Sequence, residues 1–291
     1  EAAPFRDSKK EVYIGSEDYF NQNLKDLEGV QKSMEWYASA RSKIEARFGS
    51  NSDLFIKLLA ATSPNRTPQR NFQDASEALH MYSIGEYDNL LDSYGKKVND
   101  INDRLQTGEI TKDEAITLIK KASHDPDNRV FKSNGKNFGT RSVDGMVIRS
   151  LYGNWSNTQP GSKTIQFANN LSGRDKSATI DIWAARNLRK ILYSGTDAPW
   201  RMRTMQESGV NKKDFDFAQA IYTQAADKIG LTPYQLQAAM WNGEKQLWIE
   251  NGWTNKSGAP SYLSEIIPSE QLTDRVMLGA SSYIGKDASS W

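Results

Sequence analysis

Apolar residues recur at helical spacing along most of the chain, and this periodicity limits the possible folds more than any other feature. Within residues 17–48, apolar residues recur in steps of three and four that keep to one helix face, through Leu24, Leu27, Val30, Met34, Tyr37, Ala40 and Ile44. No stretch of useful length alternates apolar and polar residues with the period of two that marks a strand. The pattern therefore predicts an all-α protein.

Capping and turn residues divide this pattern into separate helices. Gly49 ends the first helix, Asp53 caps a second that stops before Pro64, and Thr111 with Glu114 forms a capping box. The other helices are expected at residues 68–84 (opening at 68 or 71), 86–105, 111–122, 143–152, 162–172, 181–194, 212–229, 232–249 and 269–278. The polar, Gly- and Asn-rich stretch 123–147 is expected to be the longest irregular segment, with His124 a solvated loop residue.

The composition restricts the chemistry that the chain can perform. Its 291 residues include no cysteine, which excludes disulfides, thiolate nucleophiles, cysteine-bound zinc and iron–sulfur clusters. The two histidines, His80 and His124, argue against a Ser-His-Asp triad or a histidine-rich metal site. Acid–base and nucleophilic chemistry is therefore left mainly to carboxylates, lysines and tyrosines, and no metal or cofactor is expected.

The charge and hydropathy of the chain bear on its partners. A formal net charge of +1 differs from the strongly basic profile of an obvious nucleic-acid binder. Basic residues do gather in the run 186–203, which is typical of a solvated helix face but would also suit backbone phosphates. No stretch of eighteen apolar residues predicts a membrane span, and the polar N-terminal segment is not typical of a targeting signal.

The most informative segment lies between residues 160 and 186. A Pro160-Gly161 turn leads into a helix whose first turn holds Lys163, and the backbone N–H groups at such a helix start can bind a phosphate. This helix ends at Gly173, and a polar loop then leads to Asp181 ahead of another apolar run. Asp181 is therefore placed to cap the next helix.

This segment resembles the signature of the endonuclease III and 8-oxoguanine glycosylase branch of the helix-hairpin-helix (HhH-GPD) DNA glycosylases. That branch has a Pro-Gly hairpin, a Lys-Thr pair opening a helix, and an Asp about eighteen residues after the Lys, the separation of Lys163 and Asp181 here. Arg186 matches an Arg five positions after that Asp. Upstream, residues 58–63 followed by Asn71 and Ala75 resemble the early helix of the family, so the resemblance covers roughly residues 35–200.

The resemblance implies a two-lobed helical glycosylase-like fold with extra C-terminal helices. Its domains would be an N-terminal extension at 1–16, a glycosylase-like domain at 17–205 and a C-terminal helical extension at 206–291. The cleft between the two lobes would be lined by residues near Thr62 to Arg66, by Lys163 and by Asp181.

The resemblance also implies a chemistry and a set of site residues. A modified or damaged base would be flipped out of a DNA duplex, Lys163 would attack the sugar C1′, and Asp181 would stabilise the sugar cation or activate the nucleophile. The implied DNA-binding residues are Asn65, Arg66, Pro160, Gly161, Ser162, Thr164, Arg174, Lys176 and Arg186. The implied base pocket consists of Thr62, Ser63 and Trp183, whereas Trp241 is expected only to pack in the core.

Other functions stay open. The hairpin here is two residues shorter than the family's, which with the near-neutral charge favours a non-catalytic DNA-binding or virion structural protein on the same fold. A base-modifying enzyme on this scaffold and an unrelated helical interaction protein are further alternatives. Residues 60–64 and 237–241 also resemble uncharacterised bacteriophage proteins, which implies the cytoplasm of a bacterial host or the virion as its location.

Overall fold

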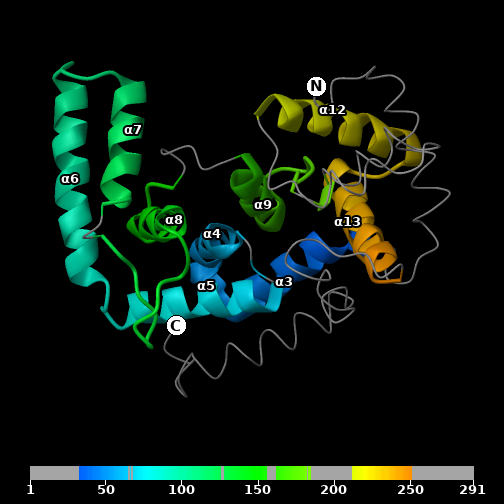
Figure 1. The fold of residues 1–291 in the computed structure, drawn as a ribbon, viewed down its shortest axis with the longest axis horizontal. Coiled ribbons are helices and arrows are strands. Elements are labelled where there is room, and N and C mark those ends of the chain that lie inside the picture. Colours follow the sequence, from blue (N-terminus) through cyan, green and yellow to red (C-terminus); the bar gives the residue numbers. More distant parts are fainter. Residues whose placement is uncertain are drawn as a thin grey trace. The chain divides into compact units, whose positions relative to one another are not determined.

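The computed structural model describes residues 33–64, 66, 68–125, 128–155, 162–181, 183–184 and 212–250 (Figure 1). Helices joined by turns make up these residues, and none of them forms a strand. The nearest approach to sheet structure among them is one isolated antiparallel bridge between Phe131 and Asn137. The predicted all-α class is confirmed.

Most helices begin and end close to the predicted positions, but the helix predicted over 17–48 is interrupted by a turn at Glu35, before α3. They are α3 (Trp36–Phe48), the 3₁₀ helix η3 (Gly49–Asn51), α4 (Ser52–Thr62), α5 (Pro68–Ser83), α6 (Asp88–Gln106), α7 (Lys112–Ser123), α8 (Arg141–Tyr152), α9 (Ser162–Ser172), α12 (Lys212–Ile229) and α13 (Pro233–Glu250). Because α8 begins at Arg141, the predicted irregular stretch 123–147 is shorter than expected. The predictions for 17–32, 185–194 and 269–278 lie outside the described residues.

The described residues divide into two compact units. Residues 44–168 form one, here called the middle unit, and residues 33–43 with 169–250 form the other, here called the split unit. In the middle unit, α4 packs against α5 and α8, while α7 lies beside both α6 and α8. Its core includes a stack of Phe48 on Phe55 at 3.9 Å between ring centroids, with the edge of Phe72 against Phe55.

The core of the split unit is rich in alanine. Ala218, Ala225 and Ala226 of α12 are buried against α13, where Leu236 and Met240 are also buried. Side chains this small let two helices approach closely. Ala178 and Ile180, which precede Asp181, belong to the same core, so the loop after α9 is anchored to the α12–α13 pair.

Local sequence signals explain several helix ends. The predicted capping box is present, with Glu114 N–H donating to the Thr111 hydroxyl and the Glu114 carboxylate accepting the Thr111 N–H. Gly153 ends α8 in the left-handed conformation, with φ of 87°. No helix within the described residues combines the length and apolar character that crossing a bilayer requires.

Candidate functional site

Lys163 lies where the sequence predicted it, in the first turn of α9. The helix begins at Ser162, the Lys163 side chain is half-buried, and Thr164 beside it is buried. Of the hairpin implied by the resemblance, Pro160 and Gly161 lie outside the described residues, as does the side chain of Ser162. Of the predicted hairpin and helix, the structure therefore describes a lysine at a helix start, and this lysine belongs to the middle unit.

Asp181 caps a helix, as predicted, and it also has a partner that the sequence did not reveal. Its Oδ1 accepts the backbone N–H groups of Trp183 and Ala184, each at 2.9 Å. Its Oδ2 accepts the indole Nε1–H of Trp241 at 3.1 Å. Three N–H donors thus fix both oxygens, and Trp241, expected only to pack, positions the carboxylate from α13.

The split unit also holds a buried polar network, in which Tyr37 feels the charge of Asp181. The Tyr37 hydroxyl donates to Gln237 Oε1 at 3.1 Å, and Asn170 Nδ2 donates to Thr179 Oγ1 at 2.9 Å. Burial raises the pKa of the Tyr37 phenol well above its usual range, and the negative charge of Asp181 raises it further. Tyr37 therefore stays protonated and serves as a neutral hydrogen-bond donor.

Two of the predicted DNA-binding residues, Arg174 and Lys176, are exposed on the loop after α9. A turn holds this loop, because Asp175 Oδ1 accepts both the N–H and the hydroxyl of Ser177, at 2.9 and 2.7 Å. The N–H of Tyr234 in turn donates to the Lys176 carbonyl. Arg174, Lys176, Asp181 and the half-buried Trp183 all belong to the split unit, whereas Arg186 and the run 186–203 lie outside the described residues.

The two hydroxyls of the predicted base pocket are engaged inside the middle unit. Thr62 is buried, and its Oγ1 lies 2.7 Å from Asn71 Oδ1 and 2.9 Å from the Leu58 carbonyl. The Ser63 hydroxyl donates to the Ala60 carbonyl at 2.9 Å. Asn65 lies outside the described residues.

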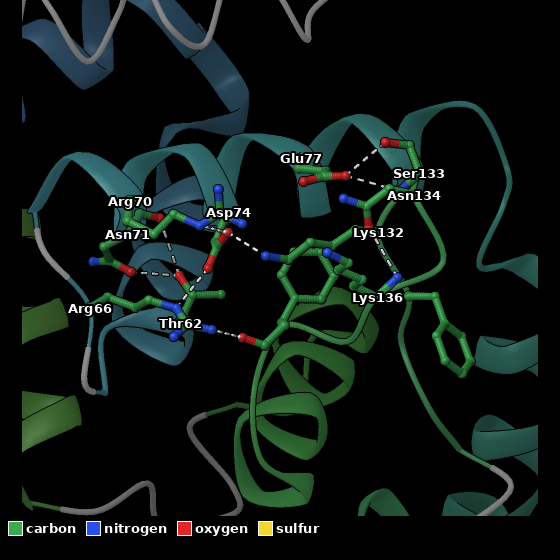
Figure 2. A network of polar contacts seen from close by, with 12 residues as sticks. Thr62, Arg66, Arg70, Asn71, Asp74, Glu77, Lys132, Ser133, Asn134 and Lys136 are labelled. Carbon is green, nitrogen blue, oxygen red and sulfur yellow. Dashed lines mark hydrogen bonds and ion pairs between the residues drawn. The ribbon is translucent and has the colours of Figure 1, made fainter.

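Arg66, a predicted DNA-binding residue, belongs to a charge cluster around a buried carboxylate that the sequence did not reveal (Figure 2). Its Nε donates to Asp74 Oδ2 at 2.9 Å, and its Nη2 donates to the Phe138 carbonyl. The fully buried Asp74 carboxylate also pairs with Arg70 Nε at 3.1 Å and Lys132 Nζ at 2.6 Å. We call Arg66, Arg70, Asp74 and Lys132 the Asp74 cluster.

The Asp74 cluster fastens the segment 128–139 to α5. One turn along this helix, Glu77 Oε1 accepts the N–H and the hydroxyl of Ser133 at 2.9 and 2.8 Å (Figure 2). The spacing of Arg70 and Asp74, four residues apart on a helix, was a local signal for one ion pair. Nothing local pointed to Lys132, which lies 58 residues after Asp74 in the chain.

The proposed catalytic pair is divided between the two units. The boundary falls inside α9, so Lys163 belongs to the middle unit and Asp181 to the split unit. Within the part of the chain that the structure describes, no three His, Asp or Glu side chains gather in a way that could hold a metal ion.

Comparison with known proteins gives one match. Residues 146–245 match the model of a family of unknown function (DUF7178), a region that contains Lys163, Asp181 and Trp241. No curated protein and no solved structure matches the chain.

Proposed function

We propose that this chain acts on DNA bases, as an N-glycosylase with or without AP-lyase activity that uses Lys163 as nucleophile and Asp181 as electrostatic stabiliser. One observation carries the proposal. A carboxylate held by three N–H donors at a helix start follows, by eighteen residues, a lysine in the first turn of α9. The resemblance to the glycosylases implied the helix-start lysine and the aspartate eighteen residues later, and the bond from Trp241 adds to them.

The proposed reaction begins with attack of the neutral Lys163 amine on C1′ of a flipped nucleotide. A C–N bond forms as the glycosidic bond breaks, the electron pair leaves with the base, and the new ammonium loses one proton while the base gains one. Opening of the sugar ring then gives a Schiff base. Asp181 moves no proton in this scheme; its fixed negative charge stabilises the positive charge that develops on the sugar.

A second candidate is a non-catalytic DNA-binding or virion structural protein that retains a glycosylase-like fold. The hydrogen bonds of Asp181 favour it, because capping Trp183 and Ala184 and accepting from Trp241 account for this carboxylate without any substrate. Exposed Arg174 and Lys176 would contact phosphates under either proposal.

Borohydride trapping on duplexes with an abasic site or a modified base tests the first candidate. We expect a covalent adduct with the wild type, none with Lys163→Gln, and an undiminished adduct with the control Lys112→Gln, which changes an exposed lysine in the first turn of α7. A wild type that binds DNA in a salt-dependent way but forms no adduct on any such duplex would refute the catalytic proposal and leave the second candidate.

The charge of Asp181 needs its own control. Asp181→Asn keeps a capping oxygen, and Asn caps about as well as Asp, but its amide would turn an N–H toward the Trp241 indole. Trp241→Phe removes the same indole hydrogen bond and leaves the charge. We expect base release to slow on the order of 10²-fold in Asp181→Asn and far less in Trp241→Phe. Equal slowing in both variants would mean that Asp181 acts through structure alone.

A further inference from the structure

Arg149 of α8 is a buried cation without a carboxylate partner among the described residues. The residue is 4% exposed, and its Nη1 donates to the Ser123 hydroxyl at 2.5 Å. Its Nε has no hydrogen-bond partner, and none of the ion pairs in the described part of the chain includes it. Buried arginines are ordinarily paired, since an unpaired buried charge is costly.

Two more basic residues lie beside this guanidinium at the end of α7. Lys120 is in the last turn of the helix and His124 follows it, and both side chains are half-buried. Burial lowers the pKa of each, and the positive charge of Arg149 lowers both further. We call Lys120, Ser123, His124 and Arg149 the Arg149 cluster.

Among the residues that the structure describes, the acids nearest to this cluster in the chain pair with other cations. Asp125 follows His124, but its carboxylate pairs with Lys97 Nζ at 2.7 Å. Asp144, on the same helix as Arg149, pairs with Arg129 Nε at 2.6 Å. The negative end of the α7 dipole offsets only about half a charge. The positive charge of the cluster therefore exceeds what the described residues compensate.

The polar atoms of His124, Ser123 and Arg149 converge on one face of α8. A Cβ placed on Gly145 would lie 2.7 Å from His124 Nε2 and 3.0 Å from the Ser123 hydroxyl oxygen. Gly145 stands four residues before Arg149, so the imidazole edge, the hydroxyl and the guanidinium share that face. His124 Nε2 is buried there without a hydrogen-bond partner in the described structure.

We propose that the Arg149 cluster binds a phosphate group, with Arg149 as the buried donor and Lys120 and His124 as its half-exposed partners. A guanidinium presents several N–H donors in a plane that matches the oxygens of a phosphate, and a lysine adds a point charge. A backbone phosphate of DNA and free inorganic phosphate offer the same chemistry. The proposal is independent of Lys163 and Asp181 and goes beyond the proposed function.

The two histidines of the chain provide a direct test. Histidine side-chain NMR signals are followed while inorganic phosphate, and in a second series a short DNA duplex, is added at constant ionic strength. Bound phosphate favours the imidazolium form, so we expect the signals of His124 to move and its pKa to rise. The signals of His80 in α5 serve as the internal control and should stay in place.

Matched variants assign the response to the cluster. Removing a hydrogen bond between charged groups weakens binding roughly 10- to 100-fold, which we expect for Arg149→Met and, to a lesser extent, for Lys120→Gln. Lys121→Gln is the control, because Lys121 is the exposed neighbour of Lys120 on the same helix turn. Should Arg149→Met fail to fold, Lys120→Gln and Ser123→Ala carry the test.

Each outcome is informative. A response to inorganic phosphate identifies a site for the free anion, and a response to the duplex alone identifies a site for a backbone phosphate. No response of His124 to either probe, or an equal response in Arg149→Met or in both substitute variants, would overturn the proposal. None of these results depends on whether Lys163 forms a covalent adduct.

Discussion

Replacing Asp74 with Asn should destabilise the middle unit strongly, because it leaves a buried ammonium without a counter-charge. The Lys132 side chain is 3% exposed, and its Nζ lies 2.6 Å from Asp74 Oδ1. With Asn at this position it would keep at most a neutral amide oxygen and the Phe138 ring, whose centroid lies 5.1 Å away. Removing one partner of a buried ion pair costs about 3–5 kcal/mol, a large part of the ~5–15 kcal/mol by which most domains are stable.

The two arginines of the cluster contribute less to this loss. Their side chains are 28% exposed at Arg66 and 47% exposed at Arg70, so solvent screens both of their charges. We therefore expect Arg70→Gln to cost under about 1 kcal/mol. Urea unfolding followed by circular dichroism gives the free energy of unfolding of both variants. Amide exchange of residues 128–139 shows whether that segment detaches from α5.

A double substitution separates loss of charge pairing from loss of shape. In Asp74→Asn with Lys132→Met, the ammonium is removed together with its counter-charge, so most of the lost stability should return. A loss under about 1 kcal/mol in Asp74→Asn, or a double variant no more stable than Asp74→Asn alone, would refute the reasoning.

Two further predictions concern His124 and its packing against α8. Burial lowers the pKa of His124 below about 6.5, so its neutral form favours the folded state above that pH, and this contribution to stability is lost as the pH falls below it. The Tm in phosphate-free buffer should therefore fall between pH 7.5 and 5 less steeply in His124→Gln than in the wild type; parallel slopes would contradict this. Gly145→Ala would place a Cβ 2.2 Å from His124 Cδ2. We expect this overpacking to lower the free energy of unfolding by roughly 1–3 kcal/mol, while the better helix propensity of alanine raises it by about 1 kcal/mol, so the Tm should fall. In a His124→Ala background the same change should raise the Tm. A rise in both backgrounds would contradict the prediction, because it would mean that the imidazole ring moves aside at little cost.

The helices were largely predictable because their ends depend on local chemistry. The predicted bounds of α9 and α12 agree with the structure, and Thr111 with Glu114 marks the start of α7 by residues three positions apart. The start of α8 was predicted two residues late. Thr140 is of a type favoured at N-caps, but it forms no side-chain capping bond, and Val143 at the third helical position cannot complete a capping box.

For the site residues, too, contacts between residues close in the chain were predictable and contacts between distant residues were not. The cap formed by Asp181 depends on residues two and three positions later and was predicted, whereas its bond from Trp241 spans 60 residues and was not. The prediction that His124 is a solvated loop residue was right about its place after α7 but wrong about its exposure, because the side chain is half-buried and its Nε2 is buried. Gly145, 21 residues later, lacks the side chain that would keep the imidazole out, and no local pattern announces that contact.

The function proposed for Lys163 and Asp181 requires both side chains to act on the same nucleotide, and the surroundings of either residue alone do not establish this. The two residues belong to different compact units, and each has an ordinary structural role available, as a helix-start lysine and as a helix cap. If both act on one flipped nucleotide, their effects on the rate of base release are not additive, and losing both costs little more than losing the more important one. If Asp181 only caps its helix, Asp181→Asn leaves that rate nearly unchanged in either background. The double-variant rate therefore separates a catalytic pair from two helix-terminal residues.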